Sequence, residues 1–416
     1  MLIVTATAGT PWRSINGGVT AASGFQAAGI TAGLKASGRP DLALLLAPEG
    51  AVCAGGFTRS LVRAACVDLC AERLEAQAGA ARAVLINSGQ ANACTGELGL
   101  SDSATATAAV ADALGLSAEA VLICSTGVIG VPIPMPTLLA GVSPLVDALS
   151  STGGDRAAEA ILTTDLVAKE IALEASFDGR PVRIGGMAKG SGMIHPDMAT
   201  MLGFICCDAG VDVDTWRAMV ARAVQRSFNA ITVDGDTSTN DTVLAFAAGE
   251  PLPQEHHAAL EAGLTAVMQH LARAIARDGE GATCLVEVTV TGAADEQGAL
   301  QIARTVCGSS LVKTAVHGRD PNWGRIVAAA GRAGVPFSAD AVDLWVESHQ
   351  LMAAGQPLAF DRAAASADLT ARAAGAYLQD DCVRIRLAVG DGSGEGRAWG
   401  CDLSDQYVRI NADYTT

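Results

Sequence analysis

The most constraining stretch of the sequence is residues 189–207, where a glycine-spaced loop runs into an uncharged apolar segment. The loop carries one lysine, and the apolar segment extends from Met201 to Cys207. A short apolar run that ends in a turn-like sequence is typical of a buried strand. We therefore expect Thr200 to stand at the mouth of a core strand, directly after a loop.

A threonine hydroxyl at such a position can act as a nucleophile if another group accepts its proton. Cleavage of the bond between Ala199 and Thr200 would place a free α-amine on the same residue, and that amine can serve as the base. The unperturbed pKa of an α-amine is about 7.7–8.0, close to a working pH. An Ala-Thr pair at the start of a strand is also an ordinary structural sequence, so these residues alone leave both interpretations open.

Length, composition and charge narrow the class of protein. A chain of 416 residues allows two or three domains with a substantial core. Half of the residues are hydrophobic and 17% are charged, which indicates a compact globular protein. The formal net charge of -16 argues against nucleic acid or an anionic membrane as a partner.

The sequence also indicates the compartment. No apolar stretch reaches the roughly 18–20 residues of a transmembrane helix, and the first residues lack the basic and apolar regions of a signal peptide. The eleven cysteines form no C-x-x-C pair and lie mostly in apolar runs, as reduced core thiols do. The six histidines show no metal-ligand spacing. We therefore expect a cytoplasmic protein without a metal site.

Several apolar runs end in loops of small polar residues. Residues 42–46, 83–86 and 121–124 read as buried strands, and the last two continue into loops at residues 87–96 and 125–130. The first loop is suited to hold a polar ligand, although it reads equally well as a structural turn. In the second loop the backbone can turn its amide groups into a cavity, as an oxyanion hole requires.

Helices are predicted at residues 101–114, capped by Ser101, and at residues 215–228, capped by Asp214. A third, long helix is predicted to follow the turn at residues 251–254 and to end at about Arg277.

From residue 285 the pattern changes to strand, helix, strand, which predicts a smaller α+β domain at residues 285–416 after a main domain at residues 1–284. Residues 391–396 predict a hairpin turn between strands at residues 383–389 and 397–403.

Residues 189–202 read KGSGMIHPDMATML. This segment resembles the self-cleavage segment of the ornithine acetyltransferase family, the glutamate N-acetyltransferases of arginine biosynthesis. The resemblance spans nearly the whole chain, from residues 17–20 to residues 411–416. It includes residues 228–241, expected to form a polar loop that braces the active site, and residues 317–325, expected at a domain interface or site wall.

The resemblance implies an α/β (α+β) protein with the family's layered, N-terminal-nucleophile-like fold of sheets between helices. It also implies that Thr200 attacks the carbonyl of Ala199, splits the chain into α and β pieces and then serves as the catalytic nucleophile. Thr126 and Gly127 match the family's oxyanion-stabilising Thr-Gly pair. The substrate-binding residues that the resemblance implies are Thr163, Lys189, Thr200, Glu280, Asn411 and Thr416.

The reaction implied by the resemblance transfers an acetyl group from N²-acetylornithine to glutamate through an acetyl-Thr200 intermediate, in a ping-pong sequence without a cofactor. Some family members also accept acetyl-CoA, and the matched motifs are shared by both kinds. The family assembles two α and two β pieces. Lys189 and Glu280 can neutralise the carboxylate and ammonium groups of the amino acid, and opposite charge favours Lys189 for the α-carboxylate.

Two residues depart from the family pattern. Leu166 stands where the family usually has threonine, which favours Thr163 over Thr164 as the substrate contact. Cys284 replaces a basic residue, which concerns a local ion pair and leaves Glu280 in place.

Two alternatives remain open from the sequence. One is an amidase or aminopeptidase of the same fold, in which water resolves the acyl-enzyme. The other is a non-catalytic binding or scaffold protein, in which the chain stays whole.

Overall fold

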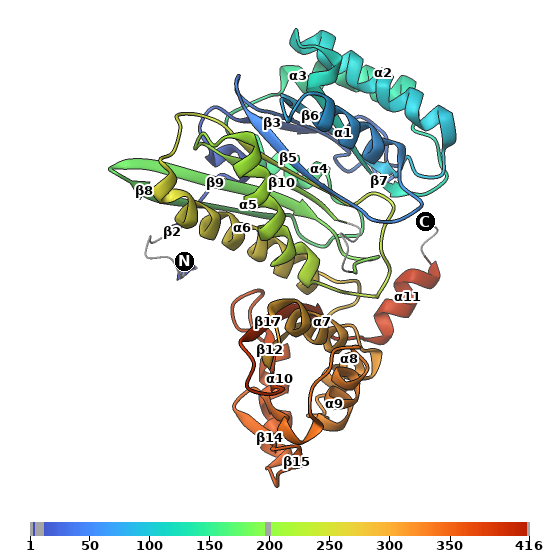
Figure 1. The fold of residues 1–416 in the computed structure, drawn as a ribbon. Helices are drawn as coiled ribbons and strands as arrows, with labels where there is room; N and C mark the ends of the chain where they lie inside the picture. Colours follow the sequence, from blue (N-terminus) through green and yellow to red (C-terminus); the bar gives the residue numbers. More distant parts are fainter. Residues whose placement is uncertain (1–2, 5–11, 196–200, 414–416) are drawn as a thin grey trace.

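The computed structural model describes residues 3–4, 12–195 and 201–413. Ala199, Thr200 and Thr416 therefore lie outside the described residues. The described chain forms an upper lobe with two sheets and a lower lobe with a third (Figure 1).

The upper lobe contains a seven-stranded and a four-stranded sheet. In spatial order, the larger sheet consists of β1 (Ile3–Val4), β2 (Trp12–Ile15), β8 (Lys169–Phe177), β9 (Arg180–Lys189), β10 (Leu202–Cys207), β11 (Thr242–Ala247) and β5 (Val52–Phe57). The smaller sheet consists of β3 (Gln26–Ile30), β4 (Leu42–Leu46), β6 (Ala83–Gln90) and β7 (Val121–Val128).

Helices surround these sheets. The upper lobe contains α1 (Ala65–Ala76), α2 (Gly96–Leu114), α3 (Met135–Asp147), α4 (Gly154–Ala160), α5 (Val213–Gln225) and α6 (His257–Arg277). Those of the rest of the chain are α7 (Glu296–Cys307), α8 (Ser310–His317), α9 (Trp323–Gly331), α10 (Arg362–Ala373) and α11 (Asp405–Asp413).

The two sheets of the upper lobe stack face to face. Leu45 of β4, Cys124 of β7 and Phe204 of β10 belong to one buried apolar cluster between the sheets. The strands of the interior are apolar on both faces because α5 and α6 cover the outer face of the larger sheet and α2 and α3 that of the smaller one. The resulting helix–sheet–sheet–helix layers confirm the expected α/β fold class (Figure 1).

The lower lobe has a six-stranded sheet with helices packed on one face, and at the end nearest the upper lobe Trp399 and Cys382 pack into the core of that lobe. In spatial order its strands are β15 (Gln356–Pro357), β14 (His349–Ala353), β13 (Asp343–Val346), β16 (Cys382–Ala388), β12 (Leu285–Ala293) and β17 (Gly394–Cys401). Strand β16 alternates between Val383 and Ile385, buried against α7, α8 and α9, and the exposed Arg384 and Arg386.

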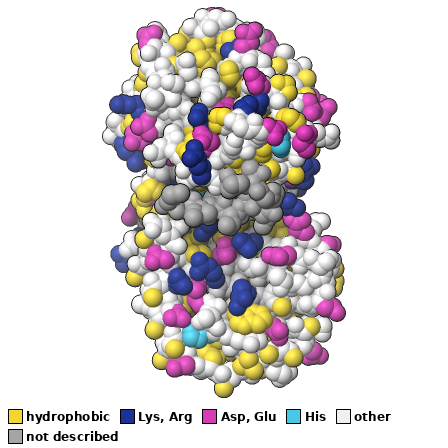
Figure 2. Space-filling view, turned by 90° about the vertical axis from the view of Figure 1, so that its left-hand side faces the viewer, with side chains coloured by type: hydrophobic (Ala, Val, Ile, Leu, Met, Phe, Trp, Pro, Cys, Tyr) yellow, Lys and Arg dark blue, Asp and Glu magenta, His cyan; other side chains and the backbone are white. Residues whose placement is uncertain are grey.

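The exposed surface carries charges of both signs. Figure 2 shows one side of the molecule, on which basic and acidic side chains are interspersed over both lobes. Within the described ranges, no helix combines the length and apolarity needed to cross a membrane.

Two predicted helices begin earlier in the structure. Helix α2 starts at Gly96, not Ser101, because the side-chain amide of Asn92 donates to the carbonyl of Gly99 (3.0 Å) and holds the first turn. Helix α5 is capped by Asp212, whose carboxylate accepts a hydrogen bond from the backbone of Thr215 (3.0 Å), so the predicted cap at Asp214 is wrong.

The predicted hairpin across residues 391–396 is also wrong. Strands β16 and β17 lie on opposite sides of β12, parallel and antiparallel to it, and do not pair with each other. The connection passes around the end of β12, where a side chain on Gly392 would overlap the carbonyl of Ala293. The glycines therefore allow this close approach and do not form a tight turn.

Trp216 should be one of the largest single contributors to the stability of the upper lobe. Its side chain projects from α5 and is fully buried, and its indole N–H donates to the carbonyl of Ala245 in β11 (2.8 Å). Trp216→Ala should lower the free energy of unfolding by about 3–5 kcal/mol, measured by chemical denaturation. Trp216→Phe keeps most of the buried ring and should cost clearly less; equal losses for the two variants would contradict the packing argument.

Candidate active site

A cavity of about 120 Å³ lies where the ends of β7 and β9 meet the C-terminal helix α11. The residues lining it include Thr126 and Gly127 of β7, Thr163 and Thr164 after α4, Lys189 of β9, residues 238–240 before β11, Glu280 after α6 and Asn411 of α11. The structure thus brings six sequence-predicted residues together: Thr126, Gly127, Thr163, Lys189, Glu280 and Asn411. Thr163 and Thr164 both line the cavity, so position alone does not separate them.

The parallel pairing of β6 and β7 places Gly127 directly beside Gly89. Gly127 has φ +131°, and a side chain there would overlap the backbone of Gly89. Only glycine fits this conformation at this spacing. The backbone next to Thr126 is therefore free of side-chain bulk where it borders the cavity.

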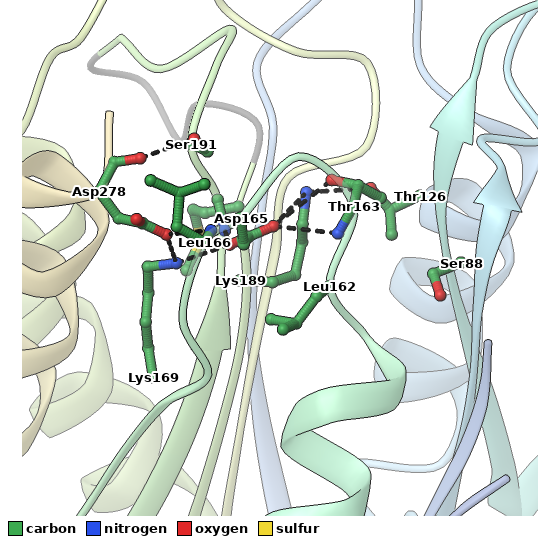
Figure 3. A network of polar contacts seen from close by, with 12 residues as sticks. Ser88, Thr126, Leu162, Thr163, Asp165, Leu166, Lys169, Lys189, Ser191 and Asp278 are labelled. Atoms are coloured by element: carbon green, nitrogen blue, oxygen red, sulfur yellow. Dashed lines mark hydrogen bonds and ion pairs between the residues drawn. The ribbon is translucent and has the colours of Figure 1, made fainter. Parts of the chain in front are cut away.

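Thr126 and Lys189 form a hydrogen bond at the cavity wall. The Lys189 Nζ lies 3.3 Å from the Thr126 Oγ1 (Figure 3). An ammonium group can only donate, so the threonine oxygen is the acceptor in this pair. The hydroxyl proton of Thr126 is left to donate to another group, which is the property that an oxyanion-stabilising residue needs.

A buried carboxylate, Asp165, connects the elements behind this wall. It accepts hydrogen bonds from Lys169 Nζ (2.7 Å), Gly190 N (2.7 Å) and Thr163 N (3.1 Å), and its Oδ2 lies 4.0 Å from Lys189 Nζ (Figure 3). Burial raises the pKa of Asp165, but the two lysine ammonium groups outweigh it and hold that pKa well below its usual range.

Lys169 extends the network to Asp278. Its Nζ donates to Asp278 Oδ2 (2.6 Å), which also accepts from the backbone N–H of Leu166 (3.0 Å). The Asp278 carbonyl accepts from the Ser191 hydroxyl (2.6 Å). Burial raises the pKa of Asp278 despite the neighbouring Lys169. Sequence reasoning missed the roles of Asp165, Lys169 and Asp278, because no local pattern in the sequence links these three residues.

Glu280 and Asn411 meet at another wall of the cavity. The side-chain amide of Asn411 donates to Glu280 Oε2 (2.8 Å), and the backbone N–H of Glu280 donates to the carbonyl of Ser191 (3.0 Å). The first contact brings the C-terminal helix to the cavity, and the second connects Glu280 to the loop after β9. The cavity therefore carries one cationic and one anionic side chain, Lys189 and Glu280.

Two aspartates of one loop flank the segment at residues 196–200. Asp234 accepts from the backbone N–H groups of Met193 (2.6 Å) and Ile194 (2.8 Å), and the fully buried Asp241 accepts from that of Met201 (2.9 Å). Burial raises the pKa of both carboxyls. The polar loop thus holds the chain on both sides of the segment that contains Thr200.

Residues 317–325 do not line the cavity. The His317 Nδ1 lies 2.8 Å from the Asp402 Oδ2, and Arg319 donates to the Thr283 hydroxyl (3.0 Å). Thr283 belongs to the segment that follows Glu280, and Asp402 lies between β17 and α11, so both contacts are at the junction of the two lobes. Cys284, one of the departures from the family pattern, is buried there, and its N–H donates to Asp402 (3.1 Å).

The described part of the chain contains no cluster of side chains suited to a metal ion. No group of three or more histidine, cysteine, aspartate or glutamate side chains within it is arranged to hold a metal ion. All eleven cysteines are free thiols, and all but Cys94 are buried.

Most of the chain is similar to proteins of one known family. The sequence pattern of the ArgJ family matches residues 26–416. The chain is 72% identical over 407 residues to the arginine biosynthesis bifunctional protein ArgJ of Parasynechococcus marenigrum strain WH8102, covering 98% of this chain and 97% of that protein.

Two solved structures are similar over part of the chain. The bifunctional protein ArgJ of Bacillus halodurans is 41% identical, over 52% of this chain and 100% of that one, with a TM-score of 0.48. The ornithine acetyltransferase of Mycobacterium tuberculosis, solved with ornithine, is 46% identical over 44% of this chain and 98% of that one, with a TM-score of 0.42. From the family match and the relative at 72% identity, the chain belongs to the ArgJ family, as its motifs indicated.

Proposed function

We propose that this protein transfers the acetyl group of N²-acetylornithine to glutamate, giving ornithine and N-acetylglutamate. The observation that carries the proposal is the convergence of Thr126, Gly127, Lys189 and Glu280 on one cavity. A cation and an anion in one cavity suit a substrate that carries both charges. The relatives' name, a bifunctional protein of arginine biosynthesis, supports the same reaction class.

The proposed chemistry has two half-reactions. The Thr200 Oγ attacks the acetyl carbonyl while the α-amine of Thr200 takes its proton, and the Thr126 hydroxyl with the Gly127 N–H stabilises the oxyanion. Collapse of the intermediate returns that proton to the leaving amine, so ornithine departs and acetyl-Thr200 remains. The amine of glutamate then attacks the ester and regenerates the Thr200 hydroxyl.

The α-amine itself arises by self-cleavage in this proposal. The Thr200 Oγ attacks the carbonyl of Ala199 through a five-membered ring, the amide becomes an ester, and water hydrolyses the ester to give a carboxylate on Ala199. Strands β9 and β5 of the first piece pair with β10 and β11 of the second. The two pieces would therefore remain joined through one sheet after cleavage.

Three finer features belong to the same proposal. We infer a domain boundary between residues 284 and 285, supported by the start of β12 at Leu285 and by the separate apolar cluster of the six-stranded sheet. Following the family resemblance, we infer an assembly of two α and two β pieces. We also infer acetyl-CoA as a second acetyl donor, consistent with the word bifunctional in the relatives' names.

The decisive experiment mixes the purified protein with N²-acetylornithine and glutamate and quantifies every product. One ornithine per N-acetylglutamate, without accumulation of acetate, is expected for a transferase. Acetate release without N-acetylglutamate would indicate the amidase alternative, and absence of both products would overturn the proposal. A parallel reaction with acetyl-CoA as the only donor tests bifunctionality.

Thr200→Ala should leave a single uncut chain that transfers no acetyl group. Alanine lacks the hydroxyl that both self-cleavage and turnover use, whereas Thr200→Ser keeps it and should retain some cutting. A denaturing gel reports cleavage into residues 1–199 and 200–416, and circular dichroism checks folding. Acetyl transfer by a folded Thr200→Ala protein would refute the assignment of the nucleophile.

Thr126→Ala should slow both self-cleavage and turnover by roughly 10²–10³-fold, because each step passes through an oxyanion and loses one donor. Thr126→Ser keeps the hydroxyl and is the matched control, expected to stay close to the wild type. Single-turnover kinetics and a cleavage time course measure the two steps. Unchanged rates for both steps in Thr126→Ala would exclude a role for this side chain.

Glu280→Ala should weaken amino-acid binding far more than it slows self-cleavage. The carboxylate offers charge to the substrate ammonium, and losing such a contact typically weakens binding by about 10- to 100-fold. Asn411→Ala removes the hydrogen bond to Glu280 without removing the charge and should cost less. An unprocessed Glu280→Ala protein would show instead that Glu280 supports the fold of the cleavage segment.

A further inference from the structure

Four charged side chains are buried behind the cavity: Asp165, Lys169, Lys189 and Asp278. The side chains of Asp165 and Lys169 are 0% exposed, and those of Lys189 and Asp278 are 3% exposed. Burying charges costs free energy even when they are paired, and a protein in which apolar residues of similar volume replace them is often equally stable. The chemistry proposed above uses Lys189 and leaves Asp165 and Lys169 without a role.

Asp165 lies where three walls of the cavity meet. Its carboxylate accepts from the backbone N–H of Thr163, which belongs to the segment after α4. It also accepts from the backbone N–H of Gly190, at the start of the loop that leads to residue 200. The same carboxylate faces the ammonium of Lys189 at 4.0 Å. One side chain therefore fixes the relative positions of these three groups (Figure 3).

The two lysines are paired unequally. Lys169 Nζ donates to Asp165 Oδ1 (2.7 Å), Asp278 Oδ2 (2.6 Å) and the Val167 carbonyl (3.2 Å), which uses all three of its protons. Within the described ranges, Lys189 makes one hydrogen bond, to Thr126 (3.3 Å). Lys189 thus keeps donor protons for a ligand in the cavity, whereas Lys169 has none left.

We propose that Asp165 is a positioning residue of the substrate site, which holds the Lys189 ammonium at the cavity wall. Lys169 neutralises part of the negative charge of Asp165, so Lys189 still attracts the carboxylate of the bound amino acid. This inference rests on the proposed function. It assigns Lys169 the role of a permanent counter-ion, which prevents Asp165 from closing a tight ion pair with Lys189 and so from competing with the substrate.

The charges around Lys189 define how it responds to substitution. Burial lowers the pKa of Lys189, the carboxylates of Asp165, Asp241 and Glu280 raise it, and the cations of Lys169 and Lys35 lower it. Only protonated Lys189 attracts a carboxylate. Carboxylate affinity is therefore present below the pKa of Lys189 and is lost as the pH rises through it.

Two substitutions should act in opposite directions. Asp165→Asn keeps an acceptor for Gly190 but removes a negative charge, so the loss of affinity should move to lower pH by about one unit or more, a tenfold or greater weakening at a fixed alkaline pH. Lys169→Gln removes a positive charge and frees Asp165 to pair with Lys189, so affinity at neutral pH should fall while its loss moves to higher pH. A purely structural defect cannot shift the two variants in opposite directions.

The test measures glutamate affinity by calorimetry from pH 6 to 11 for the self-processed wild type and both variants. The titration of glutamate itself is common to all three proteins, so differences between the curves report on the protein. Asp381→Asn is the matched control: Asp381 is also fully buried and paired with an arginine, Arg277, but has no contact with Lys189. This control should lose stability without moving the curve.

Shifts of both variants in one direction, or no shift in either, would overturn the inference. If Asp165→Asn does not fold, Lys169→Gln decides alone, because a curve that is unmoved or moved to lower pH contradicts the proposal. Acetyl transfer is assayed in parallel on the wild type. If the wild type transfers acetyl groups but the affinity curves of both variants stay unmoved, only the role of Asp165 is rejected. If the curves shift as expected but the wild type transfers no acetyl group, only the proposed reaction is rejected.

Discussion

The antiparallel pairing of β9 with β10 is the constraint on which the rest of the site depends. In this register Lys189, the last residue of β9, lies opposite Leu202, the first residue of β10. Residues 190–201 therefore connect two neighbouring core strands, and the bond before Thr200 belongs to that connection. Because residues 184–189 of β9 and all of β10 are buried, a slip of the register would disrupt the packing of their side chains. The site thus inherits its geometry from the sheet.

Charge is the second constraint, because aspartate carboxylates hold both ends of the connection between β9 and β10, and two of them, Asp165 and Asp241, are buried. Asp165 binds residue 190, Asp234 binds residues 193 and 194, and Asp241 binds residue 201. Each carboxylate accepts backbone N–H groups that would otherwise be buried without partners, which offsets part of its own cost of burial. Such an arrangement fixes the backbone without occupying the cavity, so that the space remains available for substrate.

The sequence predicted the core strands and most of the cavity, but not the network behind it. Residues 42–46, 121–124 and 201–207 are apolar without interruption, and the structure confirms β4, β7 and β10 there. The cavity residues came from motif resemblance. Asp165 and Lys169 are four residues apart, a spacing that suggests a pair on a helix surface, whereas here they lie before and within a strand. Their partner Asp278 is more than a hundred residues away, beyond any local pattern.

The C-terminal helix shows why polar contacts far from the cavity matter to it. Helix α11 has no buried residue, so apolar burial does not fix its position. Asp402, just before the helix, accepts from Thr283 N (2.7 Å), Cys284 N (3.1 Å) and the Thr283 hydroxyl (2.6 Å). The chain entering α11 is thereby tied to the chain leaving Glu280. Since the Asp402 carboxylate fixes both segments, Asn411 and Glu280 are positioned together. The lower lobe thus contributes one wall of a cavity whose other walls belong to the upper lobe.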